Sequence, residues 1–497
     1  MKHILKSVIL CSSAVALLAS CSKLKEDVYS SVFTTNFYKS AQDAEAALTA
    51  AYGSIADLYY GPAAVLVSDF SADQSYPRAV VGRNTLTLFS YDQDYTTQKS
   101  FGRTFEGPQG IWQYCYKGIE NANWVIEKVP EIAMDESRKN AIIGEALFLR
   151  AFYHFTLTKN FRDIIVRTTP SKQESDAVQG KSSQADVFKQ IYKDLDEAAA
   201  KLPSYSASVT KGRASKEVAM ALHAKAALYG ENWQLAKEKA VQVINSGKYS
   251  LLQDVLDLYN VEKEDFARAE VLFAFEGEPG AVQDFTYLMG LSGPRNSQGR
   301  DYGNSTFGSL FAYQAFFESF NPSDKRRQLL DTTYINRSNQ VVPQKDITPI
   351  TPKGVLIKKY MDKNSNGDRN RTNVPILRLA DIYLIAAEAE ARLNGATTTA
   401  YQYINAIRRR AGLNDLATGL SKEAFIDAVL QERSWEFFAE GDRWYDLSRT
   451  NTFMAVIPRA VNDVYPTRNP QQRNRYFPIP LDEIRANPKV EQNPEWK

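Results

Sequence analysis

The sequence predicts a mainly α-helical protein in which helix pairs carry a long, irregular, loop-rich face, with only minor β structure. Three observations support this fold class. Ala- and Leu-rich stretches with helical spacing recur along the chain and end at Pro, Gly or Asn. Two of these stretches are followed, after a short turn, by a second helical stretch. Two long segments, 62–108 and 274–372, are instead rich in Gly, Asn, Ser, Asp and Pro, and their interspersed aromatic residues argue against disorder.

The first twenty residues are predicted to be a targeting segment outside the fold. Lys2 and Lys6 flank the start of an apolar run over 7–19, which is too short to cross a bilayer as a helix. The run ends in Leu18-Ala19-Ser20-Cys21, which resembles the bacterial lipobox, where the cysteine receives a diacylglycerol and becomes the new N-terminus. We therefore predict a lipoprotein signal peptide over 1–20 and lipid attachment at Cys21. A plain signal peptide cut near Ser20 is the alternative.

Beyond the signal peptide, the chain is predicted to form one domain. Residues 21–40 are expected to be the lipid-anchored tether and the start of the fold, and 41–497 a single α-helical domain that includes both loop-rich segments. No later apolar run approaches the roughly 18–20 residues that a membrane-spanning helix needs. The sequence therefore predicts a protein that is anchored to a membrane by lipid and does not span it.

Composition excludes several classes of chemistry. The chain has 60 Lys+Arg and 58 Asp+Glu, and removing Lys2 and Lys6 with the signal peptide leaves 58 residues of each sign. A neutral chain has no basic field to attract nucleic acid, so no nucleic-acid partner is expected. The chain holds three cysteines, too few for a disulfide framework, and three histidines, which leave little room for a multi-histidine metal centre. We predict no cofactor and no metal site.

Helical periodicity places the main elements. The expected helices, in chain order, are 41–58, 112–129, 144–161, 185–202, 215–229, 233–244, 375–393, 398–411 and 421–439. A short strand is expected at 271–275. The helix pairs at 215–246 and 375–411 each have an Ala-rich first helix, a short turn and a second helix with Ala at close-approach positions. This layout is typical of divergent tetratricopeptide repeats, although unrelated helical hairpins would show the same periodicity.

Motifs for catalysis are absent from the sequence. It contains no HExxH, GxSxG, Walker A or Gly-rich dinucleotide fingerprint. His154 and His223 each lie inside an Ala-, Leu- or aromatic-rich helix, where a core histidine is the simpler interpretation. Cys115 lies between aromatic residues and is expected to be buried and inert. Nothing distinguishes one carboxylate pair among 58 acids as a glycosidase centre, so a non-enzymatic protein is predicted.

The segment 432–449 is the most distinctive part of the chain. Glu432, Glu436 and Glu440 follow one another at every fourth position and are expected to share one helical face. Two tryptophans within ten residues indicate that this row is partly buried, which favours a structural ion network over a catalytic site. The residues expected to pair with the glutamates, once the chain turns at Gly441, are Arg433, Arg443 and Arg449.

Motifs along the chain resemble those of the SusD/RagB family of outer-membrane nutrient-binding lipoproteins. The segment 432–449 is similar to the family signature Glu-Arg…Glu-Gly-x-Arg-Trp-x-Asp-Leu-x-Arg. The segment 375–389 resembles the family's Leu-Arg-Leu-Ala-Glu helix, with Asp381 in place of the usual Glu. Further segments that resemble the family are 121–123, 144–153, 404–413, 476–484 and 492–494. The chain departs from the family after Phe161. The family commonly has the sequence Gly-Asp-x-Pro after the aromatic residue, whereas this chain has Arg162-Asp163-Ile164-Ile165, without the Gly and the Pro.

The resemblance implies a fold of four tetratricopeptide-like helix pairs and an irregular ligand face. It also implies a lipoprotein at the cell outer membrane, facing the extracellular surface, that binds oligosaccharides and delivers them to a partner TonB-dependent transporter of the SusC-like type. Two alternatives stay open: a peptide-binding member of the same family, and a repeat scaffold that holds protein partners and binds no small ligand.

The candidate ligand residues come from side-chain chemistry, because the family motifs mark the scaffold. Sugar recognition uses flat apolar faces for stacking and planar polar groups that bridge hydroxyls. Two loop regions supply both kinds of group. The candidates in the first region are Asp69, Asp73, Tyr76, Arg78, Tyr91 and Tyr95. The candidates in the second region are Tyr287, Arg295 and Tyr302. Local packing is the alternative role for each of them.

Overall fold

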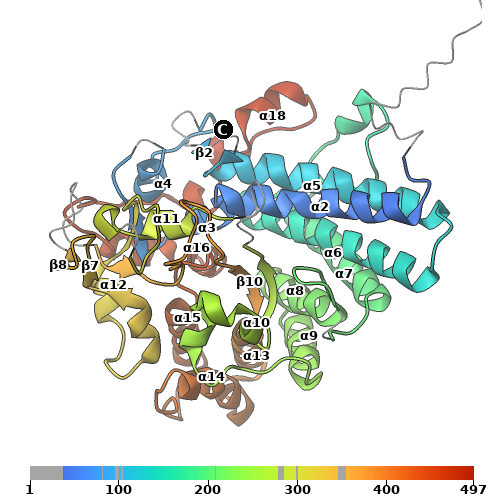
Figure 1. Ribbon diagram of the computed structural model, residues 1–497. Helices are drawn as coiled ribbons and strands as arrows, with labels where there is room; N and C mark the ends of the chain where they lie inside the picture. The colour runs from blue at the N-terminus through green and yellow to red at the C-terminus, as the bar shows by residue number, and fades with distance from the viewer. Residues whose placement is uncertain are drawn as a thin grey trace, which may run out of the picture.

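A computed structural model describes residues 37–80, 82–95, 100–101, 104–206, 209–277, 285–297, 300–344 and 354–497. The predicted signal peptide and Cys21 lie outside the described residues. Helices dominate the described chain, as the sequence predicts (Figure 1). Within the described ranges, no helix combines the length and the apolar character that crossing a membrane requires.

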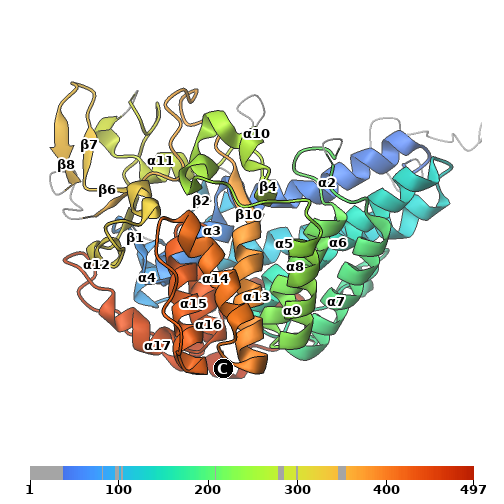
Figure 2. The ribbon, with the colours of Figure 1, turned by 90° about the horizontal axis from the view of Figure 1, so that it is seen from below.

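The helices form a continuous scaffold in which each packs on its neighbour in the chain. In order, they are α2 (Ala41–Tyr60), α5 (Pro108–Lys128), α6 (Glu136–Phe161), α7 (Gln184–Lys201), α8 (Lys216–Tyr229), α9 (Trp233–Asn245), α13 (Leu379–Asn394), α14 (Thr398–Arg410) and α15 (Lys422–Glu436). Contacts run from α2 to α5 and on through α6, α7, α8 and α9 to α13, which also contacts α14 and α15. The result is a curved layer of antiparallel pairs that confirms the tetratricopeptide-like prediction (Figure 2).

Local sequence explains why these helices begin and pack where they do. The hydroxyl of Ser40 accepts a hydrogen bond from the Asp43 amide, and the Asp43 carboxylate accepts one from the Ser40 amide, which caps α2. Ser215 caps α8 in the same way through its hydroxyl. In the middle of α8, Ala221, Ala224 and other alanines are fully buried, so small side chains allow the helices to approach closely.

Four boundaries differ by three or more residues from the sequence-based prediction, the first being the start of α5 at Pro108 rather than 112. Helix α6 begins at Glu136 rather than 144, because the Asp135 side chain caps it by accepting from the Arg138 amide. Residues Val374–Arg378 form strand β10 rather than the start of a helix, and pair antiparallel with β4 (Val271–Phe275), which lies where a strand was predicted. Helix α15 ends at Glu436, so Glu440 is not on the same helix as the other glutamates of the row.

The loop-rich segments lie opposite the helical layer in Figure 2, where they carry short elements. The first segment contains α3 (Ala63–Ser71), β1 (Ser75–Pro77), α4 (Asn84–Leu88), β2 (Ser100–Phe101) and β3 (Thr104–Phe105). The second contains α11 (Leu288–Ser292), β5 (Leu310–Ala312), α12 (Gln314–Glu318), β6 (Leu330–Asp331), β7 (Thr333–Ile335), β8 (Val341–Pro343) and β9 (Leu356–Ile357). Helix α3 was not predicted because it is short and buried on almost every side, its polar residues included, which leaves no amphipathic stripe to recognise.

Four further short α-helices of the described chain lie outside the scaffold and outside the groups of elements given above for the two loop-rich segments. Helix α10 (Glu264–Ala267) precedes β4, and α16 (Arg443–Arg449), α17 (Phe453–Val456) and α18 (Leu481–Ala486) follow α15.

In the loop after α6, Arg162 takes φ 66°, in the left-handed region that favours glycine. The loop therefore keeps a backbone turn suited to glycine although this chain has arginine at that position.

Candidate functional site

The two loop regions selected by side-chain chemistry meet through two strands whose paired residues lie more than two hundred positions apart in the sequence. Strand β1 of the first region pairs antiparallel with β5 of the second, with Ser75 opposite Ala312. The pairing continues past the strand, where the Arg78 amide donates to the Ser309 carbonyl at 3.1 Å. The structure thus brings the segment of Tyr76 and Arg78 beside the loop region that holds the second set of candidates.

Two candidates of the first region, Tyr76 and Asp69, are buried beneath the surface, and a third, Asp73, is partly buried. The Tyr76 ring packs against Tyr313 with centroids 4.7 Å apart and is 2% exposed. The Asp73 carboxylate accepts two hydrogen bonds from Arg443, at 2.8 and 2.9 Å. Asp69 is 1% exposed, and burial raises its pKa to about 8. These side chains therefore contribute packing and hydrogen bonds within the protein and do not form an exposed ligand surface.

Three further candidates also pack inward. Tyr91 lies 5.1 Å from the Phe477 ring, centroid to centroid. The Tyr95 hydroxyl donates to the Pro478 carbonyl at 2.5 Å. Tyr302 is 5% exposed. The structure therefore gives these tyrosines the packing role that the sequence left open as an alternative.

Tyr287 is the candidate that remains partly exposed within an aromatic group. Its ring lies 5.1 Å from that of Tyr60, 5.6 Å from Phe285 and 6.2 Å from Phe307, measured between centroids. Its hydroxyl is 3.2 Å from that of Tyr60. Tyr60 and Phe307 are also partly exposed, and we call Tyr60, Tyr287 and Phe307 the aromatic platform. Tyr60 was missed because it ends helix α2, and Phe307 lies within the loop-rich segment 274–372 but was not selected as a candidate.

Two arginine candidates lie beside one another at the same surface. Arg78 is half-buried and Arg295 is exposed. Burial lowers the pKa of Arg78, and the positive charges of Arg295 and Arg83 lower it further. Arg83 itself is paired in the interior with Glu106, at 2.7 Å. The described charges that act on Arg78 are therefore both positive.

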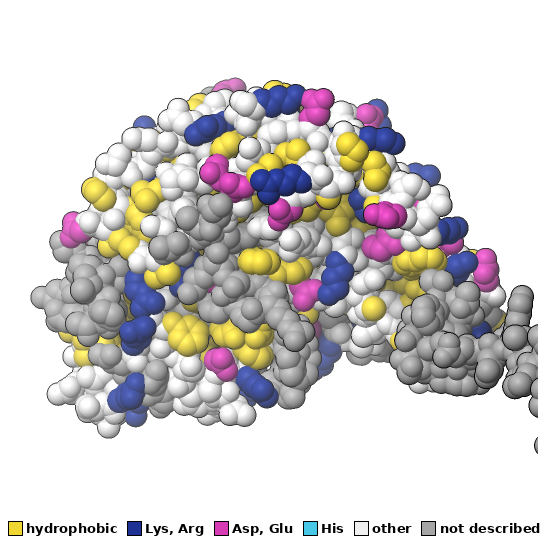
Figure 3. Space-filling model, turned by 90° about the horizontal axis from the view of Figure 1, so that it is seen from above, with side chains coloured by type: hydrophobic (Ala, Val, Ile, Leu, Met, Phe, Trp, Pro, Cys, Tyr) yellow, Lys and Arg dark blue, Asp and Glu magenta, His cyan; other side chains and the backbone are white. Residues whose placement is uncertain are grey.

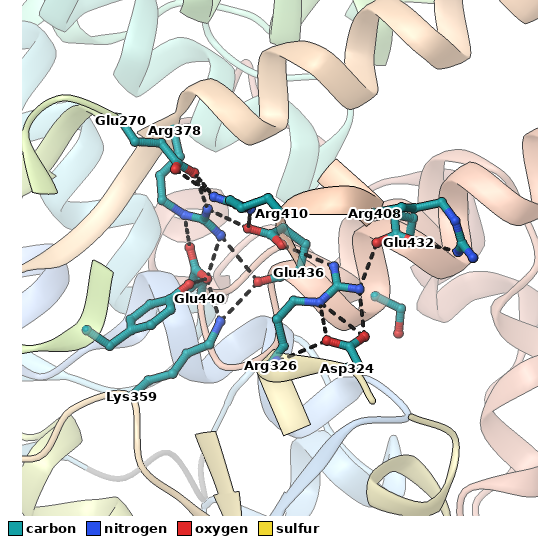
Figure 4. Close-up of polar contacts among 12 residues, drawn as sticks. Glu270, Asp324, Arg326, Lys359, Arg378, Arg408, Arg410, Glu432, Glu436 and Glu440 are labelled. Carbon is teal, nitrogen blue, oxygen red and sulfur yellow. Dashed lines mark hydrogen bonds and ion pairs between the residues drawn. The ribbon is translucent and has the colours of Figure 1, made fainter. Parts of the chain in front are cut away.

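The glutamate row forms a buried ion cluster, as the sequence predicts, but with different partners (Figure 4). Glu436 accepts from Arg326 at 3.1 Å, from Arg378 at 2.8 Å and from Arg410 at 2.5 Å. Glu440 pairs with Arg378 and with Lys359, at 2.9 and 2.6 Å. The remaining pairs of the row join Glu432 to Arg326 and Arg408.

The arginines expected to pair with that row bind other acids, so this part of the prediction is wrong. Arg433 pairs with Asp381 and Asp446. Arg443 pairs with Asp73, and Arg449 with Glu388 and Asp446. The chain turns after α15, with Ala439 at φ 59° and Gly441 at φ 84°, and this turn directs the arginines that follow it away from the glutamate row.

The ion cluster is suited to structure rather than to proton transfer. Burial alone would raise the pKa of Glu436, but Arg410, Arg378 and Arg326 hold it well below its usual range. A carboxylate that is fixed in its ionised form by three guanidinium groups does not exchange protons near neutral pH. The cluster joins α15 to α14, β10 and the loop that follows α12, and so fixes the scaffold beneath its connections.

The histidines and the free cysteine lie in the interior. His154 is fully buried, and burial lowers its pKa to about 3. His223 is 1% exposed, and burial lowers its pKa to about 4. Cys115 is buried, as predicted, and burial raises its pKa. Over the described ranges, no three or more His, Cys, Asp or Glu residues are grouped so that they could hold a metal ion.

Comparisons with known proteins agree with the fold. A family model described as "SusD family" matches residues 328–496, and one described as "Starch-binding associating with outer membrane" matches 24–228. A SusD-like protein of Formosa agariphila is 28% identical over 94% of both chains. The starch-binding protein SusD of Bacteroides thetaiotaomicron is 32% identical over 29% of this chain and 26% of its own. A crystal structure of a SusD superfamily protein from Bacteroides vulgatus superposes with a TM-score of 0.75 at 25% identity, covering 93% of this chain and 100% of that one.

Proposed function

This chain belongs to the SusD-like family, and we propose that it is a cell-surface lipoprotein that binds oligosaccharides and delivers them to a TonB-dependent outer-membrane transporter of the SusC-like type. The starch-binding relative and the family description support a glycan as the ligand. The proposal is one of capture and delivery, without catalysis.

The junction of the two loop regions carries the proposal. There the aromatic platform offers partly exposed rings, and sugar rings bind by laying their apolar faces on such surfaces. Arg78 and Arg295 lie at the same junction, and a guanidinium group donates paired hydrogen bonds to the oxygens of a ligand. Stacking surfaces and planar donors together are the chemistry that oligosaccharide recognition needs.

Calorimetric titration of the detergent-purified full chain against a panel of oligosaccharides tests the ligand. At least one glycan should bind, and Tyr287→Ala should weaken binding by about threefold to tenfold, because ring contacts contribute about 0.5–1.5 kcal/mol. Tyr403→Ala is the matched control, since Tyr403 is a partly exposed ring on α14 that meets Tyr383 edge-on at 6.1 Å. Flat titrations across the whole panel would contradict the proposal.

Lipid attachment and the transporter partner need separate tests. Metabolic labelling with a fatty acid should mark the wild-type chain and leave Cys21→Ala unlabelled. An affinity-tagged chain, purified from the outer membranes of the cell that naturally makes it, should retain a TonB-dependent transporter. Labelling that survives Cys21→Ala would contradict the anchor, and recovery of the chain alone would contradict the partnership.

A further inference from the structure

Arg78 and the segment of Arg295 both hydrogen-bond, through their backbones, to the short segment 308–309, which therefore brings them together. The Arg78 amide donates to the Ser309 carbonyl at 3.1 Å, and the Gly308 amide donates to the Gly293 carbonyl at 2.8 Å. A side chain on Gly308 would place its Cβ 3.6 Å from the Arg295 nitrogen and 3.9 Å from its Cγ. Gly308 thus lies directly beside Arg295, and its φ of 56° is in the left-handed region that favours glycine.

Among the described residues, neither arginine forms an ion pair with a carboxylate. Many other arginines of the described part are paired with acids, from the interior (Arg433 with Asp381) to the surface (Arg409 with Asp415). Arg83, the other positive group near Arg78, is already neutralised by Glu106. The junction thus holds two positive charges that no described acid offsets.

This local charge is not part of a wider basic surface. The chain without its signal peptide carries equal numbers of acidic and basic residues. The face seen in Figure 3 has Lys and Arg side chains interspersed with Asp and Glu rather than gathered in one field. Two like charges held together repel each other, and a bound anion would relieve that repulsion.

The charges adjoin the aromatic platform along the same short loop. The Phe307 amide donates to the Gly290 carbonyl, at 2.6 Å, and one residue separates Phe307 from Ser309, which holds Arg78. Two residues span at most about 7 Å, so Phe307 and the residue that holds Arg78 lie within about the length of one sugar unit of each other. A ring-stacked sugar therefore has guanidinium groups within reach of its substituents.

We propose that the ligand is an acidic glycan, whose carboxylate or sulfate groups are bound by Arg78 and Arg295 while its sugar rings lie on the aromatic platform. This inference rests on the proposed glycan-binding function and narrows it to a chemical class. Carboxylate and sulfate groups can each accept two parallel hydrogen bonds from a guanidinium group, so the experiment separates these two sources.

Binding of matched acidic and neutral glycans to the detergent-purified full chain tests the inference. One pair is oligogalacturonate against galactose oligosaccharides, and the other is a sulfated galactan against its desulfated form. At least one acidic member should bind about tenfold more tightly than its neutral match, the difference expected of one charge-assisted contact. Raising NaCl from about 50 mM to about 500 mM should weaken that binding, because exposed charges are screened.

Substitutions of Arg78 and Arg295 test whether these two side chains bind the acidic groups of the glycan. Arg78→Ala combined with Arg295→Ala should weaken acidic-glycan binding by about tenfold or more, and the double Lys variant should retain part of it because the charge remains. Arg409→Ala, which removes an exposed arginine of α14, should bind as wild type. The thermal midpoint of each variant shows that it is folded.

The outcomes distinguish the acidic-ligand inference from the more general proposal that the protein binds glycans. Equal or tighter binding of the neutral members, or unchanged binding by the folded double Ala variant, would overturn the acidic-ligand inference and leave glycan binding intact. Absence of binding to every acidic and neutral glycan would overturn both.

Discussion

Arg378 places its Nη1 2.8 Å from Oε1 of Glu436, joining the end of β10 to the end of α15 with both side chains almost wholly buried. The same carboxylate also receives Arg326 and Arg410. One glutamate thus balances three guanidinium groups that arrive from different parts of the chain, and the stability of the scaffold depends on it.

Removing that carboxylate should strongly destabilise the protein. Glu436→Ala removes a carboxylate that three buried arginines share and leaves them only their other acidic partners, such as Glu440 for Arg378. Removing one member of a buried ion network typically costs about 3–5 kcal/mol in the free energy of unfolding. Urea denaturation measures this difference. Asp415→Ala, which breaks the exposed pair with Arg409, is the control and should stay within about 0.5 kcal/mol of wild type. A small effect of Glu436→Ala would mean that the cluster is not structural.

Asp69 should make the protein less stable as pH rises. Its folded-state pKa of about 8 lies above the value of about 3.9 expected in the unfolded chain. Between these values the folded protein holds a proton that the unfolded chain has released, so the free energy of unfolding falls with increasing pH. Asp69→Asn removes this contribution, and its stability relative to wild type should increase between about pH 5 and pH 8.

Asp73 provides the opposite case for the same measurement. Burial acts to raise its pKa, but Arg443 lowers it below the ordinary value. Its stabilisation is therefore present above the unfolded pKa and is lost only as pH falls through the lower folded value. Asp73→Asn should reduce the thermal midpoint at about pH 5 and at about pH 8 alike. If the stabilities of Asp69→Asn and Asp73→Asn, each relative to wild type, changed with pH in the same way, then the opposite directions given to the pKa values of these two carboxyl groups would be wrong.

Gly441 is required by close backbone approach as well as by its dihedral angle. Its φ is 84°, and an added Cβ would lie 2.7 Å from the Ala64 carbonyl oxygen and 2.9 Å from the Val65 Cα. Gly419 has φ 88° but open space around it. Gly419→Ala should cost about 1 kcal/mol for the left-handed conformation, and Gly441→Ala about 1–3 kcal/mol more for the overlap. Equal losses in urea denaturation would show that the backbone at Gly441 can yield.

Two tyrosine candidates should respond differently to removal. Tyr76 is buried against Phe311 and Tyr313, so Tyr76→Ala should lower the free energy of unfolding by about 3–5 kcal/mol, as other large aromatic truncations do. Tyr287 is partly exposed, so Tyr287→Ala should cost less stability and weaken glycan binding instead. Calorimetry of unfolding and of binding on both variants separates the roles, and a stable Tyr76→Ala variant would contradict the packing assignment.

The sequence by itself determined the helical scaffold and its pairing. Helical periodicity is a short-range property, so elements such as α7 and α9 begin and end within one residue of their predicted bounds. The strand at Val271–Phe275 was found from its apolar run, and Cys115, His154 and His223 proved to be buried, as their surroundings indicated. The acidic row at 432–440 was correctly read as a structural ion network, because tryptophans nearby indicated burial.

Only the tertiary structure decided which residues meet. Glu436 finds Arg326, Arg378 and Arg410 rather than the arginines beside it in sequence, because the turn at Gly441 and the packing of α13 to α15 set the pairs. Burial of candidates such as Tyr76 depends on packing against residues more than two hundred positions away. The pairing of β1 with β5, which brings Arg78 to the loop that carries Arg295, is likewise a long-range contact. Residue chemistry predicts the kinds of group that recognise a ligand, but their exposure is set by the packing of the whole chain.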